Sequence, residues 1–384
     1  FGSRLRHHHF LIPGPMVAQV PCRSFGVPFG DDEAILAAFR ADGVVVVEGV
    51  LDEGEADRAL GELWASPRLL GRDGRVRRGD AATWGSEAWP QQDGGRNFLE
   101  SMDASEDRAC WELPQNPHVV HVLKLLYGGP VLAQAGSRWG VMRPTADHPE
   151  WRTDENWLHW DQSPWREPGF ARVQCFLCLT AQTPSSGGLL CAPGFQARWR
   201  AWGEAHPEGS LQVAGRTITR DYGAENPFPV PEDDPVHGEM VRVLAPKGSL
   251  VLWDGRLPHQ NYPNTGTEFR VVHYLHYSPL EPTLAEEQRE VLRKKLAVRR
   301  ALGKGSGGAY FPEGLSELGR EVFGLSDGDP EEEELDPCLQ RAILLTVEAG
   351  QDELQGDLQA SVDKLRRASK AWPDIEEWHG AIFG

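Results

Sequence analysis

Residues 156–165 read Asn-Trp-Leu-His-Trp-Asp-Gln-Ser-Pro-Trp, and we expect this stretch to organise the fold. It is rich in residues that favour strands, and His159 and Asp161 stand two positions apart within it. Residues i and i+2 of a strand share a face, so an imidazole and a carboxylate can close on one metal ion there. The stretch therefore predicts half of a metal site carried on a β-strand.

A third metal ligand is expected at His259, just after the apolar run Leu250–Trp253. Two histidines and one carboxylate, with coordination positions left open, suit non-haem Fe(II) in oxygenases. Arg270 follows eleven residues later and opens another strand-like run, where its guanidinium could bind a dicarboxylate bidentately. His148 and Glu150 form a rival pair, but the proline between them would break a strand ladder.

In these residues the chain resembles the phytanoyl-CoA dioxygenase-like branch of the Fe(II)/2-oxoglutarate oxygenases. The matching motifs, in order, are His159-Trp160-Asp161, Gly187-Gly188-Leu189 with Pro193-Gly194, His259 with Asn264, and Arg270. Residues 38–51 also look like the entry helix and first strand of that family. The resemblance covers residues 30–280 or so and fades beyond them.

The resemblance implies a site and a reaction. Fe(II) would be held by His159, Asp161 and His259, 2-oxoglutarate would place its distal carboxylate on Arg270, and O2 would complete the reaction. The implied activity is hydroxylation of an unactivated C–H bond of a small molecule, with succinate and CO2 as co-products. Two positions depart from the family: Asn261 replaces a small Ser or Gly, and Gln196 replaces a His.

Asn261 and Arg138 are the further candidate contacts for the cosubstrate. Alternation along 138–142 puts Arg138, Gly140 and Met142 on one face of a strand. If that face is the barrel interior, Arg138 lies near the metal; if it is the outer face, Arg138 is an exposed strand arginine. The pattern leaves both alternatives open.

Trp157 and Trp165 are the candidate substrate contacts, because they bracket the metal motif and Trp157 shares the face of His159 by alternation. An arginine-rich irregular stretch at 68–100 is interpreted either as a lid that meets an anionic group or as a solvated loop. That stretch contains Arg68, Arg72, Arg75, Arg77, Arg78, Trp84, Trp89 and Gly94-Gly95.

The expected fold is mostly β with α: a double-stranded β-helix (jelly roll) core with N-terminal helices and a C-terminal helical extension. The expected parts are a tag and linker at 1–15, a helical scaffold at 16–130, a catalytic core at 131–280 with an insertion at 196–240, and an acidic helical extension at 281–384. Runs 171–181 and 188–191 are expected to form a hairpin-like pair around the turn at 184–188. The extension is expected to pack on the barrel or to mediate self-association.

The net charge of −18 argues against binding to nucleic acid or to a membrane surface. With no apolar run of membrane-spanning length and no signal-like segment after Met16, the sequence favours a cytoplasmic protein, or one trimmed of an organelle-targeting peptide. The six cysteines form no disulfide framework, and Cys175 and Cys178 should face opposite sides of a strand. A small-molecule substrate is the expected partner.

Two other classes of protein compete with the oxygenase hypothesis. A degenerate jelly roll could bind a metal or small ligand without oxygenase turnover. A cupin-like metal hydrolase or isomerase could use the same barrel without a keto acid, although it would leave Arg270 without a role.

Overall fold

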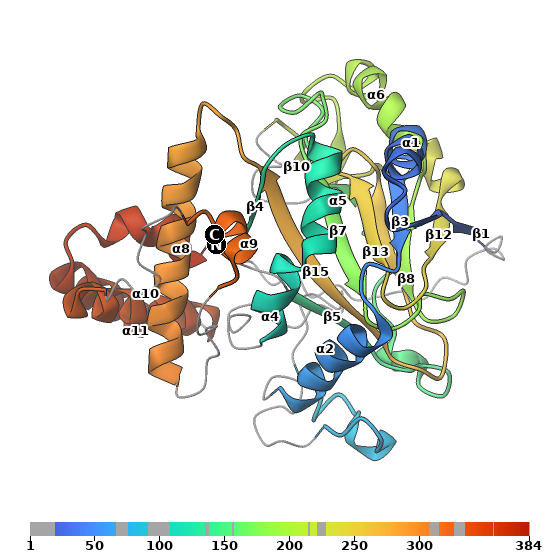
Figure 1. Cartoon of the computed structure of the whole chain (residues 1–384). Coiled ribbons are helices and arrows are strands. Elements are labelled where there is room, and N and C mark those ends of the chain that lie inside the picture. The colour runs from blue at the N-terminus through green and yellow to red at the C-terminus, as the bar shows by residue number, and fades with distance from the viewer. Residues whose placement is uncertain are drawn as a thin grey trace.

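The computed structural model describes residues 20–66, 76–90, 108–134, 138–155, 157–213, 216–220, 228–306, 315–325, 335–355 and 357–383. Two β-sheets face each other, helices cover one of them, and a separate group of helices lies to one side (Figure 1). The predicted jelly-roll core with a helical C-terminal extension is confirmed. The tag and linker at 1–15, Arg68, Arg72, Arg75 and Gly94-Gly95 lie outside the described residues.

The first sheet carries the metal motif. Its six strands run in the order β1 (Cys22–Ser24), β12 (Val241–Leu244), β8 (Gly188–Cys191), β14 (His259–Tyr262), β6 (His159–Trp160) and β11 (Phe228–Pro229). β14 is antiparallel to both β8 and β6, so it lies in the middle of the sheet. A separate short ribbon joins β9 (Gln212–Val213) to β10 (Arg216–Thr217).

The second sheet carries Arg270. Its order is β2 (Gly26–Pro28), β3 (Val44–Glu48), β13 (Leu250–Asp254), β7 (Val173–Cys178), β15 (Arg270–Pro279) and β4 (Val131–Ala133), and β5 (Arg138–Met142) also pairs with β15. One face of this sheet packs toward the first sheet, where Phe176, Val251 and Val272 join Leu189 and Trp160 in a shared core. The metal motif and Arg270 thus approach the same interior from opposite sheets.

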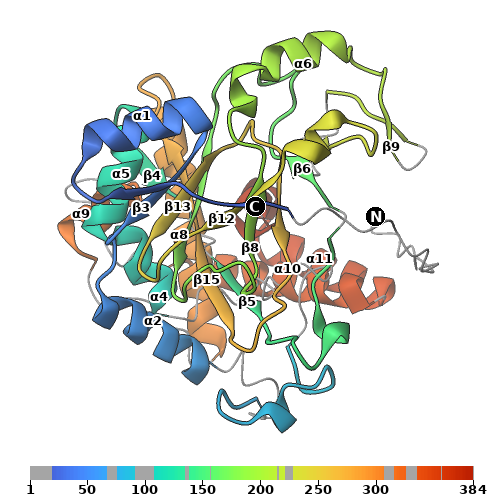
Figure 2. The same ribbon diagram turned by 90° about the vertical axis from the view of Figure 1, so that its right-hand side faces the viewer.

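The outer face of the second sheet is covered by helices. They are α1 (Asp32–Asp42), α2 (Glu53–Ala65), α4 (Ala109–Glu112) and α5 (Pro117–Tyr127). Two of these helices are capped at their N-termini: Asp31 accepts from the backbone N–H of Ala34, and Asp52 forms a capping box with Glu55. Seen from the side in Figure 2, α1, α2 and α5 lie on this outer face.

The expected hairpin between 171–181 and 188–191 is wrong. β7 pairs with β13 and β15 in the second sheet, whereas β8 pairs with β12 and β14 in the first. The turn at 184–188, with Gly187 at a φ of +83°, carries the chain from one sheet to the other. A turn signal identifies a reversal of direction but not the sheet that receives the next strand.

The region predicted as an insertion, 196–240, contains regular secondary structure. It holds α6 (Trp199–Ala205), the β9–β10 ribbon and β11, whose Pro229 lies opposite His159. Proline is tolerated there because β11 is an edge strand. Short 3-10 helices occur at Ala81–Thr83, Leu113–Gln115, Pro149–Trp151, Phe195–Ala197, Pro235–Glu239 and Ile375–Trp378.

The C-terminal extension contains α8 (Ala285–Ser306), α9 (Glu317–Val322), α10 (Pro337–Gln355), α11 (Leu358–Ala371) and α12 (His379–Phe383). α8, α10 and α11 build a small core of their own around Ile343, whereas Phe323, next to α9, is buried in the core under the second sheet. Leu358, Val362 and Leu365 are exposed along α11. Self-association through these helices stays a prediction. No helix in the described ranges has the length and apolar character needed to cross a bilayer.

Candidate metal centre

The three predicted metal ligands come together at the junction of β6 and β14. His159 lies directly opposite His259 in the antiparallel pairing of these two strands. Asp161 does not continue the strand as expected, because β6 ends at Trp160 and Asp161 lies in the bend that follows. The bend turns the carboxylate toward both imidazoles.

The ligand atoms are close enough to share one ion. Nε2 of His159 lies 3.6 Å from Oδ1 of Asp161, and Nε2 of His259 lies 3.2 Å from Oδ2. One donor atom from each residue lies within 4.8 Å of the other two. Two imidazole nitrogens and a carboxylate oxygen with open positions are the ligand set of non-haem Fe(II) centres.

Both histidines are oriented by a backbone carbonyl. Nδ1 of His159 lies 3.0 Å from the carbonyl oxygen of Trp157, and Nδ1 of His259 lies 3.0 Å from that of Leu257. A carbonyl can only accept a hydrogen bond, so Nδ1 carries a hydrogen in each ring and Nε2 is the atom left to face Asp161 and a metal ion. Backbone support of this kind orients metal-binding histidines before the metal arrives.

The electrostatics of the centre favour an ionised carboxylate. Burial alone would raise the pKa of Asp161, but the adjacent His159 and a hydrogen bond with His259 hold it well below its ordinary value. The two histidine side chains are themselves almost fully buried. The centre thus offers a negative charge and two imidazole nitrogens to an incoming cation.

Arg270 is a buried cation whose guanidinium is only partly paired. Its side chain is fully buried, and Nη2 donates to Oε1 of Gln182 at 3.2 Å. Within the described part of the chain, Nε and Nη1 find no hydrogen-bond partner. Arg270 also lies over the ring of Phe176, 5.1 Å from the guanidinium carbon to the ring centre. A buried guanidinium with two unused donor groups fits the carboxylate of an incoming ligand.

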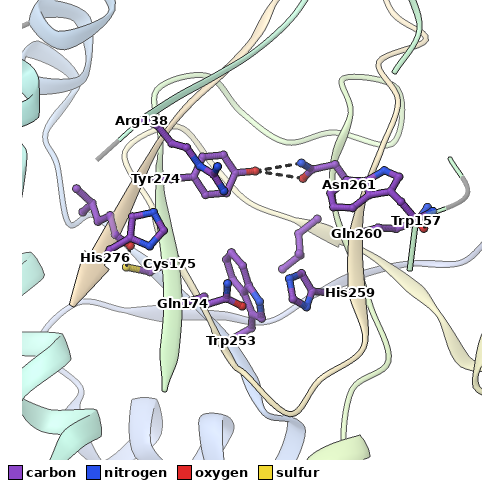
Figure 3. A pocket seen from close by; sticks show the side chains of 12 residues that line it. Arg138, Trp157, Gln174, Cys175, Trp253, His259, Gln260, Asn261, Tyr274 and His276 are labelled. Carbon is purple, nitrogen blue, oxygen red and sulfur yellow. Dashed lines mark hydrogen bonds between the residues drawn. The ribbon is translucent and has the colours of Figure 1, made fainter. Parts of the chain in front are cut away.

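A pocket of about 40 Å³ lies beside the metal ligands (Figure 3). His259, Trp157, Asn261 and Arg138 are among the residues that line it. Trp157 stacks on His159 with ring centres 5.1 Å apart. Arg138 pairs with Tyr274, which also lines the pocket, so the strand face that carries Arg138 is the interior one.

Trp165 lies elsewhere. Its indole N–H donates to the carbonyl oxygen of His206, and its ring packs edge-on against Phe228. His148 and Glu150, the rival pair, bond to each other in an exposed segment. Gln196 donates to the carbonyls of Arg40 and Ala41 and so supports the scaffold.

Several residues that line the pocket were not singled out as site residues from the sequence alone, among them Tyr274, Trp253 and Gln174. Tyr274 shares the strand face of Arg270 by alternation, which was the available signal. His276, on the same face, also lines the pocket. Burial and the positive charge of Arg138 lower the pKa of His276 to about 4, so its imidazole is neutral at pH 7.

The cysteines lie as the alternation predicted. Cys175 packs with the core beneath the helices and Cys178 with the core between the sheets. Both are buried free thiols. Burial raises the pKa of Cys178 to about 12, so this thiol is protonated and inert.

Comparison with known proteins gives a family and a fold. The profile of the phytanoyl-CoA dioxygenase family matches residues 39–272, well over half of the chain. No curated protein matches the sequence significantly.

Among solved structures, GlcNAc Inducible Gene 2 (GIG2) of Candida albicans is 13% identical, with a TM-score of 0.53, and the match covers 94% of this chain and 87% of that one. EctD from S. alaskensis, solved with 2-oxoglutarate and 5-hydroxyectoine, is 19% identical at a TM-score of 0.42, covering 64% and 75%. The epimerase SnoN, solved with Fe³⁺, α-ketoglutarate and nogalamycin RO, is 20% identical at a TM-score of 0.40, covering 65% and 83%. The likeness to GIG2 extends over the C-terminal helices and shows the fold.

The family profile places the chain among the iron(II)/2-oxoglutarate-dependent oxygenases, which use iron, 2-oxoglutarate and O2. The described residues supply what such an enzyme needs: a converged His-Asp-His group and a buried arginine in the same barrel interior. The chain belongs to the phytanoyl-CoA dioxygenase family.

Proposed function

We propose that the protein hydroxylates an unactivated C–H bond of a small-molecule substrate, with succinate and CO2 as co-products. The observation that carries this proposal is the convergence of His159, Asp161 and His259, with both imidazole Nδ1 atoms already bonded to backbone carbonyls. Iron(II) bound there, together with 2-oxoglutarate and O2, supplies the oxidising chemistry, in which one oxygen atom goes to the substrate and the other to succinate. The protein supplies positioning and exclusion of water.

The roles of the remaining residues follow from their places. Arg270 is proposed to bind the distal carboxylate of 2-oxoglutarate, because its buried charge lacks an acidic partner among the described residues. Arg138 is a proposed cosubstrate contact, since it lines the pocket, and Asn261, which also lines it, is proposed to influence cosubstrate binding. Trp157 covers His159 and is proposed to form one wall of the substrate site. Contact of Trp165 with the substrate stays a prediction; its indole N–H donates to the carbonyl oxygen of His206.

The test is a turnover screen under air with Fe(II), ascorbate, 2-oxoglutarate and a metabolite extract. The expected result is 2-oxoglutarate-dependent succinate formation and a product heavier than its parent by one oxygen atom, both absent from the Asp161→Ala variant. A product without added oxygen would redirect the proposal toward epimerisation or ring closure at the same centre.

The two competing classes predict different results in the same assay. A degenerate binding protein would form no succinate even with Fe(II) and ascorbate supplied. A metal hydrolase or isomerase would convert its substrate without O2 and without 2-oxoglutarate. Succinate formation at wild-type rate by Asp161→Ala would overturn the assignment of the metal ligands.

A further inference from the structure

The metal pocket ends before it reaches Arg270. Its volume is about 40 Å³, and it is lined by residues of both sheets. Arg270 is not among the residues that line it, although Tyr274 and His276 from the same face of β15 are. Other side chains therefore lie between the metal ligands and Arg270, the proposed carboxylate-binding residue.

The separating element is a hydrogen-bonded pair of side chains from opposite sheets. Nδ2 of Asn261, on β14, lies 3.1 Å from the hydroxyl oxygen of Tyr274, on β15, and the same hydroxyl lies 3.3 Å from Oδ1 of Asn261 (Figure 3). Both residues line the pocket. Asn261 stands two residues after the metal ligand His259, so the pair crosses the barrel interior next to the metal centre.

Arg270 lies behind this pair. The ring of Phe176 packs edge-on against Tyr274, with ring centres 5.2 Å apart, and the same ring carries the guanidinium of Arg270. Along β15, Val272 separates Tyr274 from Arg270 on the interior face. Tyr274 thus lines the metal pocket, Arg270 lies four residues away on β15, and Phe176, which pairs with Tyr274 from β7, contacts both.

The closed position of Tyr274 depends on Gly140. Gly140, on the neighbouring strand β5, pairs with Val272 of β15, and a Cβ atom built on Gly140 would lie 2.7 Å from Cε2 of Tyr274. The glycine therefore makes room for the phenol ring to lie across the interior. Arg138, two residues earlier, has its guanidinium carbon 5.7 Å from the centre of that ring.

We propose that Tyr274 and Asn261 form a gate between the metal pocket and Arg270, and that binding of 2-oxoglutarate requires their hydrogen bond to break. This inference rests on the proposed role of Arg270. A closed gate lowers the apparent affinity for the cosubstrate by the fraction of molecules in which it is open. Weakening the gate should consequently strengthen and accelerate cosubstrate binding.

The test measures binding rather than turnover. Calorimetry and stopped-flow absorbance under anaerobic conditions, on the Fe(II)-loaded protein, compare wild type with Tyr274→Phe and Asn261→Ser. Both variants should bind 2-oxoglutarate about three- to tenfold more tightly, because a neutral hydrogen bond no longer opposes opening, and association should be faster. Pyruvate, which has no distal carboxylate to reach Arg270, should bind all three proteins equally.

Tyr277→Phe is the matched control. Tyr277 lies on the same strand, and its buried hydroxyl donates to the carbonyl oxygen of Pro114, away from the pocket. This variant should bind 2-oxoglutarate as wild type does, and melting curves confirm that each variant is folded.

Unchanged or weaker 2-oxoglutarate binding in both gate variants would overturn the gate while leaving the proposed function intact. Weaker binding would instead make the pair a direct contact of the cosubstrate. Wild-type protein that binds no 2-oxoglutarate at all would overturn the proposed function and the gate with it.

Discussion

The two ends of the barrel interior are built on opposite principles. At the metal end, each imidazole is fixed by a backbone carbonyl and the carboxylate lies between the two rings. At the arginine end, a fully buried guanidinium has a single hydrogen bond, to Gln182, among the described residues. The metal end is preorganised, whereas the arginine end is left incomplete.

This difference matches the two kinds of ligand, a metal cation and a carboxylate, that the same barrel interior is proposed to bind. A cation needs a rigid cluster of donors, because its affinity depends on several short contacts made at once. A carboxylate needs a charge that no internal partner has neutralised, and the protein tolerates the cost of burying that charge. Substitution at the metal end should accordingly lower iron affinity, whereas substitution at the arginine end should weaken cosubstrate binding and stabilise the ligand-free protein.

The largest effect is expected at the metal end. Asp161→Ala removes one of three ligands and should lower Fe(II) affinity by at least about 100-fold, with loss of turnover. Anaerobic equilibrium dialysis with metal analysis measures the affinity. Asp161→Asn, which keeps the shape without the charge, should lose iron as well. Retention of iron by both variants would show that the ligands lie elsewhere.

At the arginine end, Arg270→Met should weaken 2-oxoglutarate binding by roughly 30-fold or more, since it removes the buried partner of a carboxylate. The same change should raise the free energy of unfolding of the ligand-free protein by about 1–3 kcal/mol, because an incompletely paired charge leaves the core. Urea denaturation monitors the second effect. A loss of stability would contradict the view that this end is incomplete without ligand.

A smaller effect is expected from His276, whose folded-state pKa of about 4 lies below its ordinary value of 6.5. Between these pH values the unfolded chain binds a proton that the folded protein does not, so stability should fall as the pH drops from 6.5 toward 4. His276→Gln should remove on the order of 1–2 kcal/mol of this acid-induced loss. Urea midpoints at neutral and acidic pH measure this loss of stability. His237→Gln is the control, because His237 is exposed. Identical acid sensitivity in wild type and His276→Gln would contradict the prediction.

The sequence was informative wherever chemistry and periodicity coincided. The histidines and the aspartate were found because their types and spacing point to one metal, and strand alternation placed Trp157 in the pocket and Cys175 and Cys178 on opposite faces. Alternation alone left the side of Arg138 undecided, because a strand has two faces and either can be the core.

The misses have identifiable causes. The hairpin of 171–181 and 188–191 failed because a turn does not reveal which sheet takes the next strand. Tyr274 went unnoticed since an aromatic residue in a strand looks like ordinary core material. Its hydrogen bond to Asn261 joins two different sheets, and strand alternation in the sequence does not show which residues of two sheets face each other.

The most direct test of the account is an anomalous-scattering map from crystals of the protein loaded anaerobically with Fe(II). The account predicts one iron peak per chain within bonding distance of Nε2 of His159, Nε2 of His259 and a carboxylate oxygen of Asp161. An iron bound at another place, or a site from which any of these three atoms turns away, would contradict it.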